Sequence, residues 1–156
     1  MLFRSGSANP VLANSIFRAN RAGPGEEAAV YVEGVNGGRT NAEFHHLLFE
    51  DNFGPSVSSD SGEFDSTTSG AEMDLHISDS TFIEHDCYLL VGTTATEHYG
   101  HAVVNVDNST LVATNCNGLG VAFTMTSARG GRVEGNFSNV TFRESQTLYE
   151  IGRAHV

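Results

Sequence analysis

The chain has 156 residues, 39% of them apolar and 9% aromatic, so it is long enough to bury a core and is not a disordered chain. Its 19 acidic residues outnumber its 8 basic residues, all of which are Arg, and the net charge is −11. Such an acidic surface repels phosphate backbones and anionic membranes, which excludes nucleic acid as an expected partner. No apolar run has the length of a membrane-spanning helix, so no membrane insertion is expected.

A segment of 13 residues recurs along the chain with a large apolar residue at a fixed position, the anchor. Successive anchors are 32, 33, 29 and 31 residues apart. Self-similarity at a period of 20–50 residues is typical of solenoids, propellers and repeat arrays. The five segments are Pro10–Ala22, Ala42–Gly54, Leu75–Cys87, Val104–Cys116 and Gly135–Thr147, and their anchors are Phe17, Phe49, Phe82, Leu111 and Phe142.

Other positions of the repeat also keep their chemical character. The position five residues before the anchor is always apolar, and it holds Leu12, Phe44, Ile77, Val106 and Phe137. The position three residues before the anchor is always polar, and it holds Asn14, His46, Asp79, Asn108 and Asn139. Apolar and polar columns that alternate along the chain indicate strands with an inner and an outer face. The Asx-rich column predicts corners, because Asn and Asp tolerate left-handed backbone.

Short alternating runs between the anchors complete the repeat as further strands. Residues 28–34, 87–94 and 119–126 carry β-branched and aromatic side chains with Gly near their edges, and no segment shows a helical period. A period near 31 residues is shorter than a propeller blade, which needs about 40–45 residues. It fits one three-stranded turn of a parallel β-helix, so we expect an all-β solenoid of about four to five coils.

The acidic stretch Ser58–Asp74 is predicted to be a solvated loop that lengthens one coil, because it is rich in Ser and Gly. Its acidic residues Asp60, Glu63 and Asp65 lack the spacing of a calcium-binding loop. We therefore expect no metal site and no cofactor.

Two segments follow the pattern F-x-x-N, at Phe17/Asn20 and Phe49/Asn52, and the first continues as "AGPGEEAAVYVEG". Together with the repeat over residues 10–147, this resembles right-handed parallel β-helix proteins of the pectin lyase-like fold, especially the chlamydial polymorphic outer membrane protein type. The resemblance implies a right-handed β-helix. It leaves function open, because such folds serve in adhesins, autotransporter passengers, pectinolytic enzymes and phage tailspikes.

The cysteines Cys87 and Cys116 occupy the same column of adjacent coils, five residues after the anchor. The predicted register brings their Cα atoms to about 5 Å, which is within disulfide range. A disulfide and a stacked pair of free thiols are both compatible with this register.

Three N-x-S/T sequons begin at Asn108, Asn136 and Asn139. They are candidate N-glycosylation sites if the chain is secreted by a eukaryote, and Asn108 and Asn139 belong to the predicted solvent-facing corners. The alternative is that Asn stands there only for its turn chemistry.

One outward sheet face carries the candidate catalytic residues Glu43, His45, His76 and Asp107. Glu43 and Asp107 are expected two coils apart and two residues offset, which places their Cα atoms roughly 11–12 Å apart. That is wide for a glycosidase pair, whose carboxyl groups lie about 5–9.5 Å apart. A solvated face is therefore the preferred interpretation, and catalysis is the alternative.

The closing sequence "EIGRAHV" departs from the repeat and resembles the translation of a common sequencing adapter. We therefore expect a β-helix domain over residues 1–149, cut from a longer solenoid whose flanking coils it would contact, and a non-native tail over residues 150–156. The expected function is a non-catalytic, adhesin-like or glycan-contacting scaffold outside the cell or on its surface. The alternative is a polysaccharide lyase or hydrolase of the pectin lyase-like class.

Overall fold

The structure, a computed structural model, describes residues 2–5, 7–20, 28–34, 37–52, 55–61, 70–84, 91–95, 100–113, 121–127, 130–143 and 147–151. Every regular element within these ranges is a strand. Accordingly, the described segments include no helix that could cross a membrane. The all-β class predicted from the alternating runs is confirmed.

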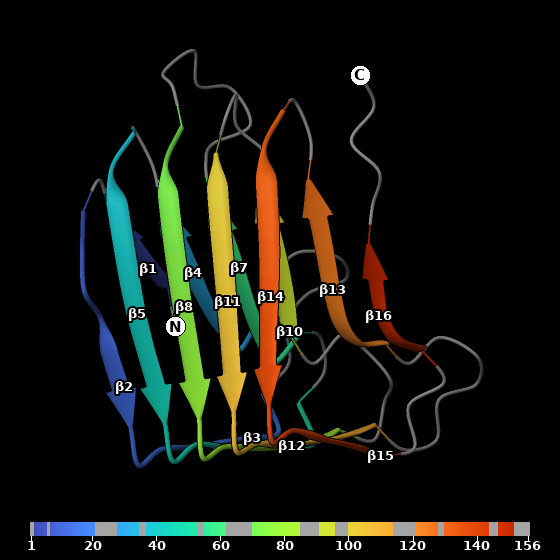
Figure 1. Cartoon of the computed structure of the whole chain (residues 1–156). Coiled ribbons are helices and arrows are strands. Elements are labelled where there is room, and N and C mark those ends of the chain that lie inside the picture. The colour runs from blue at the N-terminus through green and yellow to red at the C-terminus, as the bar shows by residue number, and fades with distance from the viewer. Residues whose placement is uncertain are drawn as a thin grey trace.

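The strands form three parallel sheets, here called A, B and C (Figure 1). Sheet A contains β1 (Leu2–Ser5), β4 (Val30–Gly34), β7 (Val57–Ser61), β10 (Val91–Ala95), β13 (Val121–Ser127) and β16 (Thr147–Ile151). Sheet B contains β2 (Val11–Ala13), β5 (Arg39–His45), β8 (Glu72–Ser78), β11 (His101–Asp107) and β14 (Arg132–Ser138). Sheet C contains β3 (Ile16–Arg18), β6 (Leu48–Glu50), β9 (Thr81–Glu84), β12 (Thr110–Ala113) and β15 (Thr141–Arg143).

The chain visits sheets A, B and C in the same order each time, so neighbouring strands of a sheet come from successive repeats. In Figure 1 sheet B faces the viewer, sheet C runs along the bottom, and β1, β4, β7 and β10 lie behind sheet B. All pairings between named strands are parallel. This arrangement is compatible with a β-helix or another solenoid-like fold.

Residues of one column predicted from the sequence pair with one another in the sheets. The anchor column pairs in sheet C as Phe17↔Phe49↔Phe82↔Leu111↔Phe142. The apolar column five residues earlier pairs in sheet B as Leu12↔Phe44↔Ile77↔Val106↔Phe137. Most of these side chains are buried, although Phe137 is 40% exposed. A one-residue slip would turn the buried ones to the outer face, so their burial fixes the register.

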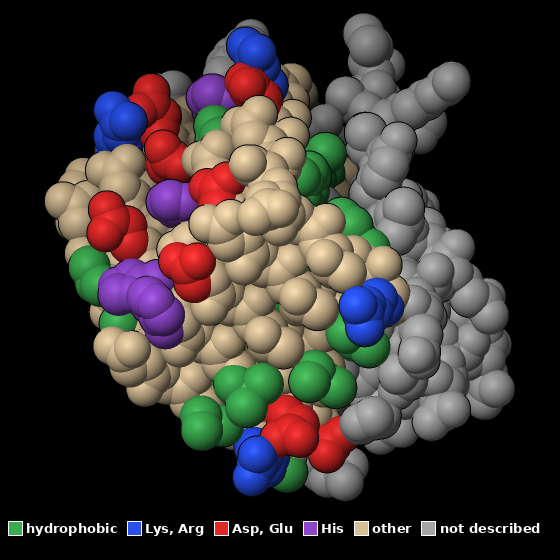
Figure 2. All heavy atoms as spheres, turned by 60° about the horizontal axis from the view of Figure 1, so that its bottom comes forward, with side chains coloured by type: hydrophobic (Ala, Val, Ile, Leu, Met, Phe, Trp, Pro, Cys, Tyr) green, Lys and Arg blue, Asp and Glu red, His purple; other side chains and the backbone are tan. Residues whose placement is uncertain are grey.

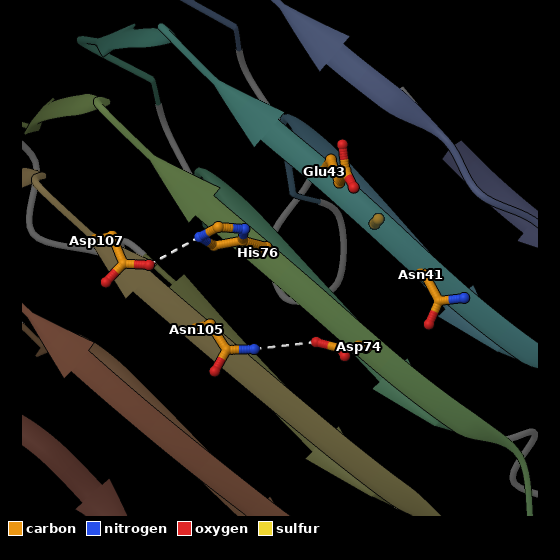
Figure 3. Close-up of a pocket in the computed structure, with 7 residues that line it drawn as sticks. Asn41, Glu43, Asp74, His76, Asn105 and Asp107 are labelled. Carbon is orange, nitrogen blue, oxygen red and sulfur yellow. Dashed lines mark hydrogen bonds and ion pairs between the residues drawn. The ribbon is translucent and has the colours of Figure 1, made fainter.

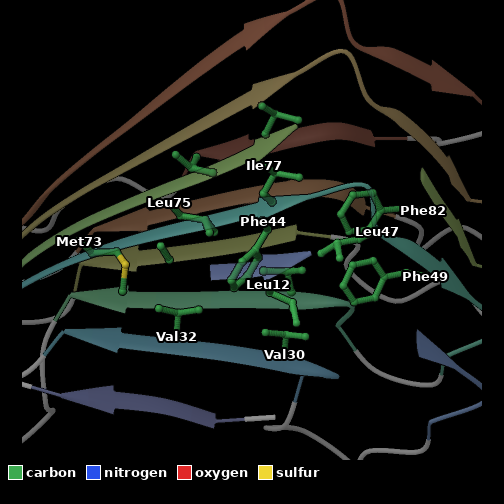
Figure 4. Packing of buried hydrophobic residues seen from close by; sticks show 14 of the residues in the cluster. Leu12, Val30, Val32, Phe44, Leu47, Phe49, Met73, Leu75, Ile77 and Phe82 are labelled. Atoms are coloured by element: carbon green, nitrogen blue, oxygen red, sulfur yellow. The ribbon is translucent and has the colours of Figure 1, made fainter. Parts of the chain in front are cut away.

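The core lies between the three sheets and is lined by both apolar columns (Figure 4). The Phe49 ring is fully buried and stacks between those of Phe17 and Phe82, with centroid distances of 4.8 and 4.7 Å. Val30 and Val32 of β4 close the core from sheet A. Stacking of like residues on successive strands therefore contributes directly to the apolar core.

The corners between sheets B and C have left-handed backbone, as the Asx-rich column predicts. The φ angles at this column are +52° at Asn14, +56° at His46, +50° at Asp79, +48° at Asn108 and +55° at Asn139. This conformation costs most residues roughly 1–2 kcal/mol, and short polar side chains such as Asn and Asp tolerate it best. The repeated choice of Asn or Asp therefore has a backbone cause, and His46 is the exception.

The Asn of the F-x-x-N motif forms hydrogen bonds between successive repeats. Asn52 is 4% exposed, and its Nδ2 donates to the carbonyl of Phe17 at 3.0 Å. Its Oδ1 accepts from the backbone N and the Nδ2 of Asn20, at 3.1 and 2.7 Å. The motif thus combines a stacked ring with a buried amide whose donor and acceptor are both satisfied.

The loop predicted for Ser58–Asp74 is wrong at both of its ends. Residues 58–61 belong to β7, which pairs with β4 and β10, and residues 72–74 begin β8. Ser59 and Ser61 are fully buried. Ser has a weak strand propensity, but pairing with two neighbouring strands overrides it. The middle of the predicted loop, including Glu63 and Asp65, lies outside the described residues.

Strand β16 runs from Thr147 to Ile151 and pairs with β13, so it crosses the domain boundary predicted after residue 149. Residues 152–156 of the predicted tail lie outside the described residues.

Candidate functional site

The outer face of sheet B carries the candidate residues in two neighbouring rows. Glu43, His76 and Asn105 pair across β5, β8 and β11, and His45, Ser78 and Asp107 form the next row. Glu43 and Asp107 are thus two strands apart and two residues offset, as predicted. These positions alternate with the buried Phe44, Ile77 and Val106 columns, which forces their side chains outward.

The side chains of His76 and Asp107 contact each other diagonally between the two rows. The Nε2 of His76 lies 2.8 Å from Oδ2 of Asp107, and Figure 3 shows them pointing toward one another. Their side chains are 47% and 36% exposed. A pair this exposed contributes about 0–1 kcal/mol to stability.

A second set of contacts on this face consists of side-chain hydrogen bonds between neighbouring strands. Nδ2 of Asn136 donates to Oδ1 of Asn105 at 2.9 Å, and Nδ2 of Asn105 donates to Oδ1 of Asp74 at 3.0 Å. On β5, Nδ2 of Asn41 donates to Oδ1 of Asn9 at 3.0 Å. The outer face therefore presents amide and carboxylate groups in a repeating order, about one strand spacing apart.

Two adjoining hollows form a groove on this face. The first, of about 340 Å³, is lined by Asn41, Ala42, Glu43, Asp74, His76, Asn105 and Asp107. The second, of about 510 Å³, is lined by Asn9, Val11, Arg39, Asn41, Glu43 and Asp74. They share Asn41, Glu43 and Asp74, so they are continuous, and we call them together the sheet B groove.

Charged side chains of both signs occupy the row where the strands of sheet B begin. Nε of Arg39 lies 3.6 Å from Oε2 of Glu72, and Nε2 of His101 lies 2.9 Å from Oε1 of Glu134. The same Glu134 oxygen is 2.8 Å from Nη2 of Arg132. Figure 2 shows acidic and His side chains gathered together on one side of the visible face, with basic side chains at the edge of that group. The described cations of this row are thus already paired with carboxylates.

Asp74 is a carboxylate of the groove that the sequence pattern did not predict. Asp74 was assigned to the predicted loop, although it is two residues before His76 and continues the outward alternation of β8. It lies one strand and two residues from Glu43, which corresponds to about 8 Å between Cα atoms. A carboxylate pair closer than Glu43 and Asp107 therefore exists on this face. Asn41 lies two residues before Glu43 on the same outward face of β5, and it too lies outside the predicted site.

Of the four candidate catalytic residues, the groove brings together Glu43, His76 and Asp107 but not His45. His45 instead contacts its neighbour His46, with 3.0 Å between their Nδ1 atoms. In the part of the chain that the structure describes, no three His, Cys, Asp or Glu side chains are placed to hold a metal ion.

All three sequon asparagines are exposed. Asn108 and Asn139 are corner residues of successive turns, and Nδ2 of Asn139 donates to Oδ1 of Asn108 at 2.8 Å. Asn136 faces outward in β14. Exposure is compatible with glycosylation, and the left-handed φ angles at Asn108 and Asn139 give these residues a structural role too. Cys87 and Cys116 lie outside the described residues.

A scan against protein-family models finds no match for this chain, and searches of curated proteins and of solved structures find no similar protein.

Proposed function

We propose that the chain is a right-handed parallel β-helix, similar to the pectin lyase-like fold and to the chlamydial polymorphic outer membrane protein repeats. In support, the chain visits three parallel sheets in cyclic order, and residues about 31 positions apart are direct neighbours. The F-x-x-N motif has a physical role in this arrangement, since its ring stacks and its Asn bonds to the previous turn. A right-handed crossover between parallel strands is also the general rule.

We further propose that the protein is a non-catalytic scaffold, outside the cell or on its surface, that contacts glycans through the sheet B groove. The groove itself carries this proposal. It is shallow, polar and crossed by a regular array of amide, imidazole and carboxylate groups, which are the partners that sugar hydroxyls require. The exposed sequon asparagines are consistent with a secreted protein.

Catalysis by the same groove is the second candidate, favoured by the spacing of Glu43 and Asp74. Their Cα atoms lie about 8 Å apart, and carboxyl groups of inverting glycosidases are roughly 6.5–9.5 Å apart. Exposure of the groove argues against it, because acid and base groups act most strongly where water is excluded. Glu43 itself is exposed, and so are the His76 and Asp107 side chains in part.

Binding of the intact chain to an array of oligosaccharides tests the proposal. The expected result is retention of at least one glycan, with binding reduced by the double variant Asn41→Ala, Asn105→Ala. Both residues lie on the outer face, so the fold should be kept, and circular dichroism checks this. Glu50→Gln on the outer face of sheet C is the control and should bind normally. Absence of binding across the array would refute the proposal.

The enzyme alternative has a separate readout. Bound glycans are incubated with the protein, and newly formed reducing ends or unsaturated products are measured. The scaffold proposal predicts none. Turnover that disappears in Asp74→Asn would instead favour the hydrolase.

A further inference from the structure

We propose that the sheet B groove selects glycans that carry no acidic groups and discriminates against uronate-bearing chains. This inference rests on the proposed function and specifies its ligand class.

The first step concerns the shape of the ligand. Val11 of β2 lines one end of the groove and Asp107 of β11 the other, so the groove crosses four neighbouring strands. Three strand spacings correspond to about 14 Å. A ligand that fills this length is extended and crosses the strands. In an extended glycan, the length of one sugar unit is about equal to the distance between two neighbouring strands.

The second step concerns hydrogen bonding. Within the described residues, the Glu43 carboxylate has no hydrogen-bond or ion-pair partner, and the Asp74 carboxylate accepts a hydrogen bond from Nδ2 of Asn105. An ionised carboxylate accepts about four hydrogen bonds and donates none. Both side chains can therefore accept from ligand hydroxyl groups. At the β2 end, Val11 is 60% exposed and offers an apolar contact for the C–H face of a sugar.

The third step concerns charge. Three carboxylates line the groove, at Glu43, Asp74 and Asp107, whereas its one lining Arg, Arg39, contacts Asn41 and Glu72. The chain contains no Lys that could compensate, and its net charge is −11. When a ligand carboxylate lies 5 Å from one groove carboxylate, the repulsion weakens binding of the ligand about fourfold in a water-like dielectric. Two such contacts disfavour a uronate chain by more than tenfold at low ionic strength, before screening by salt.

The test compares neutral oligomers with uronate oligomers, and its matched pair is β-1,4-linked glucose and β-1,4-linked glucuronate, which differ only in the carboxylate. Oligomers of β-1,4-linked glucose, N-acetylglucosamine and mannose are measured against oligomers of glucuronate and galacturonate, at low salt and with or without Ca²⁺. We expect a neutral series to bind, with affinity rising up to about four sugars, one per strand crossed. The uronate series should bind at least tenfold more weakly in both conditions.

The double variant Glu43→Gln, Asp74→Asn removes two charges and keeps the shape of both side chains. It should reduce the discrimination between neutral and uronate oligomers by roughly tenfold at low salt. The control Glu50→Gln removes a charge on sheet C and should leave the ratio unchanged.

The outcomes separate this inference from the proposed function. If uronate oligomers bind as tightly as neutral ones, or if the double variant leaves the ratio unchanged, the inference is wrong and glycan binding stands. If neither these oligomers nor any glycan of the array binds, the proposed function fails and the inference fails with it.

Discussion

The substitution Phe49→Ala probes the aromatic stack at its centre. Phe49 is fully buried, and its ring stacks on both sides at centroid distances of 4.8 and 4.7 Å. Truncation of a buried Phe to Ala costs about 3–5 kcal/mol. Stacked aromatic pairs contribute about 0.5–1.5 kcal/mol beyond their buried area. Because Phe49 takes part in two such pairs, we expect a loss of about 4–5 kcal/mol in the free energy of unfolding.

Urea unfolding followed by far-UV circular dichroism measures this loss. Phe49→Leu is the matched control, since it keeps most of the volume and removes only the stacking, and it should cost about 1–2 kcal/mol. Phe142→Ala is the positional control, because Phe142 is only partly buried, and its effect should be smaller than that of Phe49→Ala. A loss below about 1 kcal/mol for Phe49→Ala would refute the stacked column. So would a larger effect at Phe142.

Substitutions at three further positions test other parts of the account. Asn52→Ala should reduce the free energy of unfolding by about 2–3 kcal/mol, because it leaves the Phe17 carbonyl and the Asn20 amide without their partner; urea unfolding measures it, and a neutral result would contradict the role of F-x-x-N. Asp79→Gly should be tolerated, whereas Asp79→Val should cost at least about 1–2 kcal/mol, because the φ angle at this residue is +50°; equal melting temperatures would contradict this. His76→Ala should change stability by less than about 1 kcal/mol while weakening glycan binding; a large stability loss would make the His76–Asp107 pair structural.

Most of the register could be predicted from the sequence, because the fold repeats one local rule. In parallel strands of stacked turns, residues about 31 positions apart become neighbours, so each column shows the same chemistry in the sequence. Two features are repeated columns of this kind. One is the stack of the Phe17, Phe49 and Phe82 rings, and the other is the set of Asx corners, which includes Asn14 and Asp79. Each signal was strong because it was repeated.

Features that occur once were missed. The sequence of strand β7 resembles a loop, because the residues from Ser58 to Ser61 have weak strand propensity and pairing with β4 and β10 makes them extended. That error also hid Asp74, since it moved the expected start of β8 past this residue. Diagonal contacts such as His76 with Asp107 depend on side-chain direction as well as on register. The outward rows could be predicted, but the pairs formed within them could not.

The central claim is that repeats about 31 residues apart stack in parallel register. Nuclear Overhauser effects between the ring protons of Phe49 and Phe82 test it most directly, because their centroids lie 4.7 Å apart. We expect these contacts together with the backbone pattern of parallel strands between Leu48–Glu50 and β9, where Phe49 is opposite Phe82. Absence of ring contacts, or close Hα–Hα contacts typical of antiparallel strands, would contradict the account.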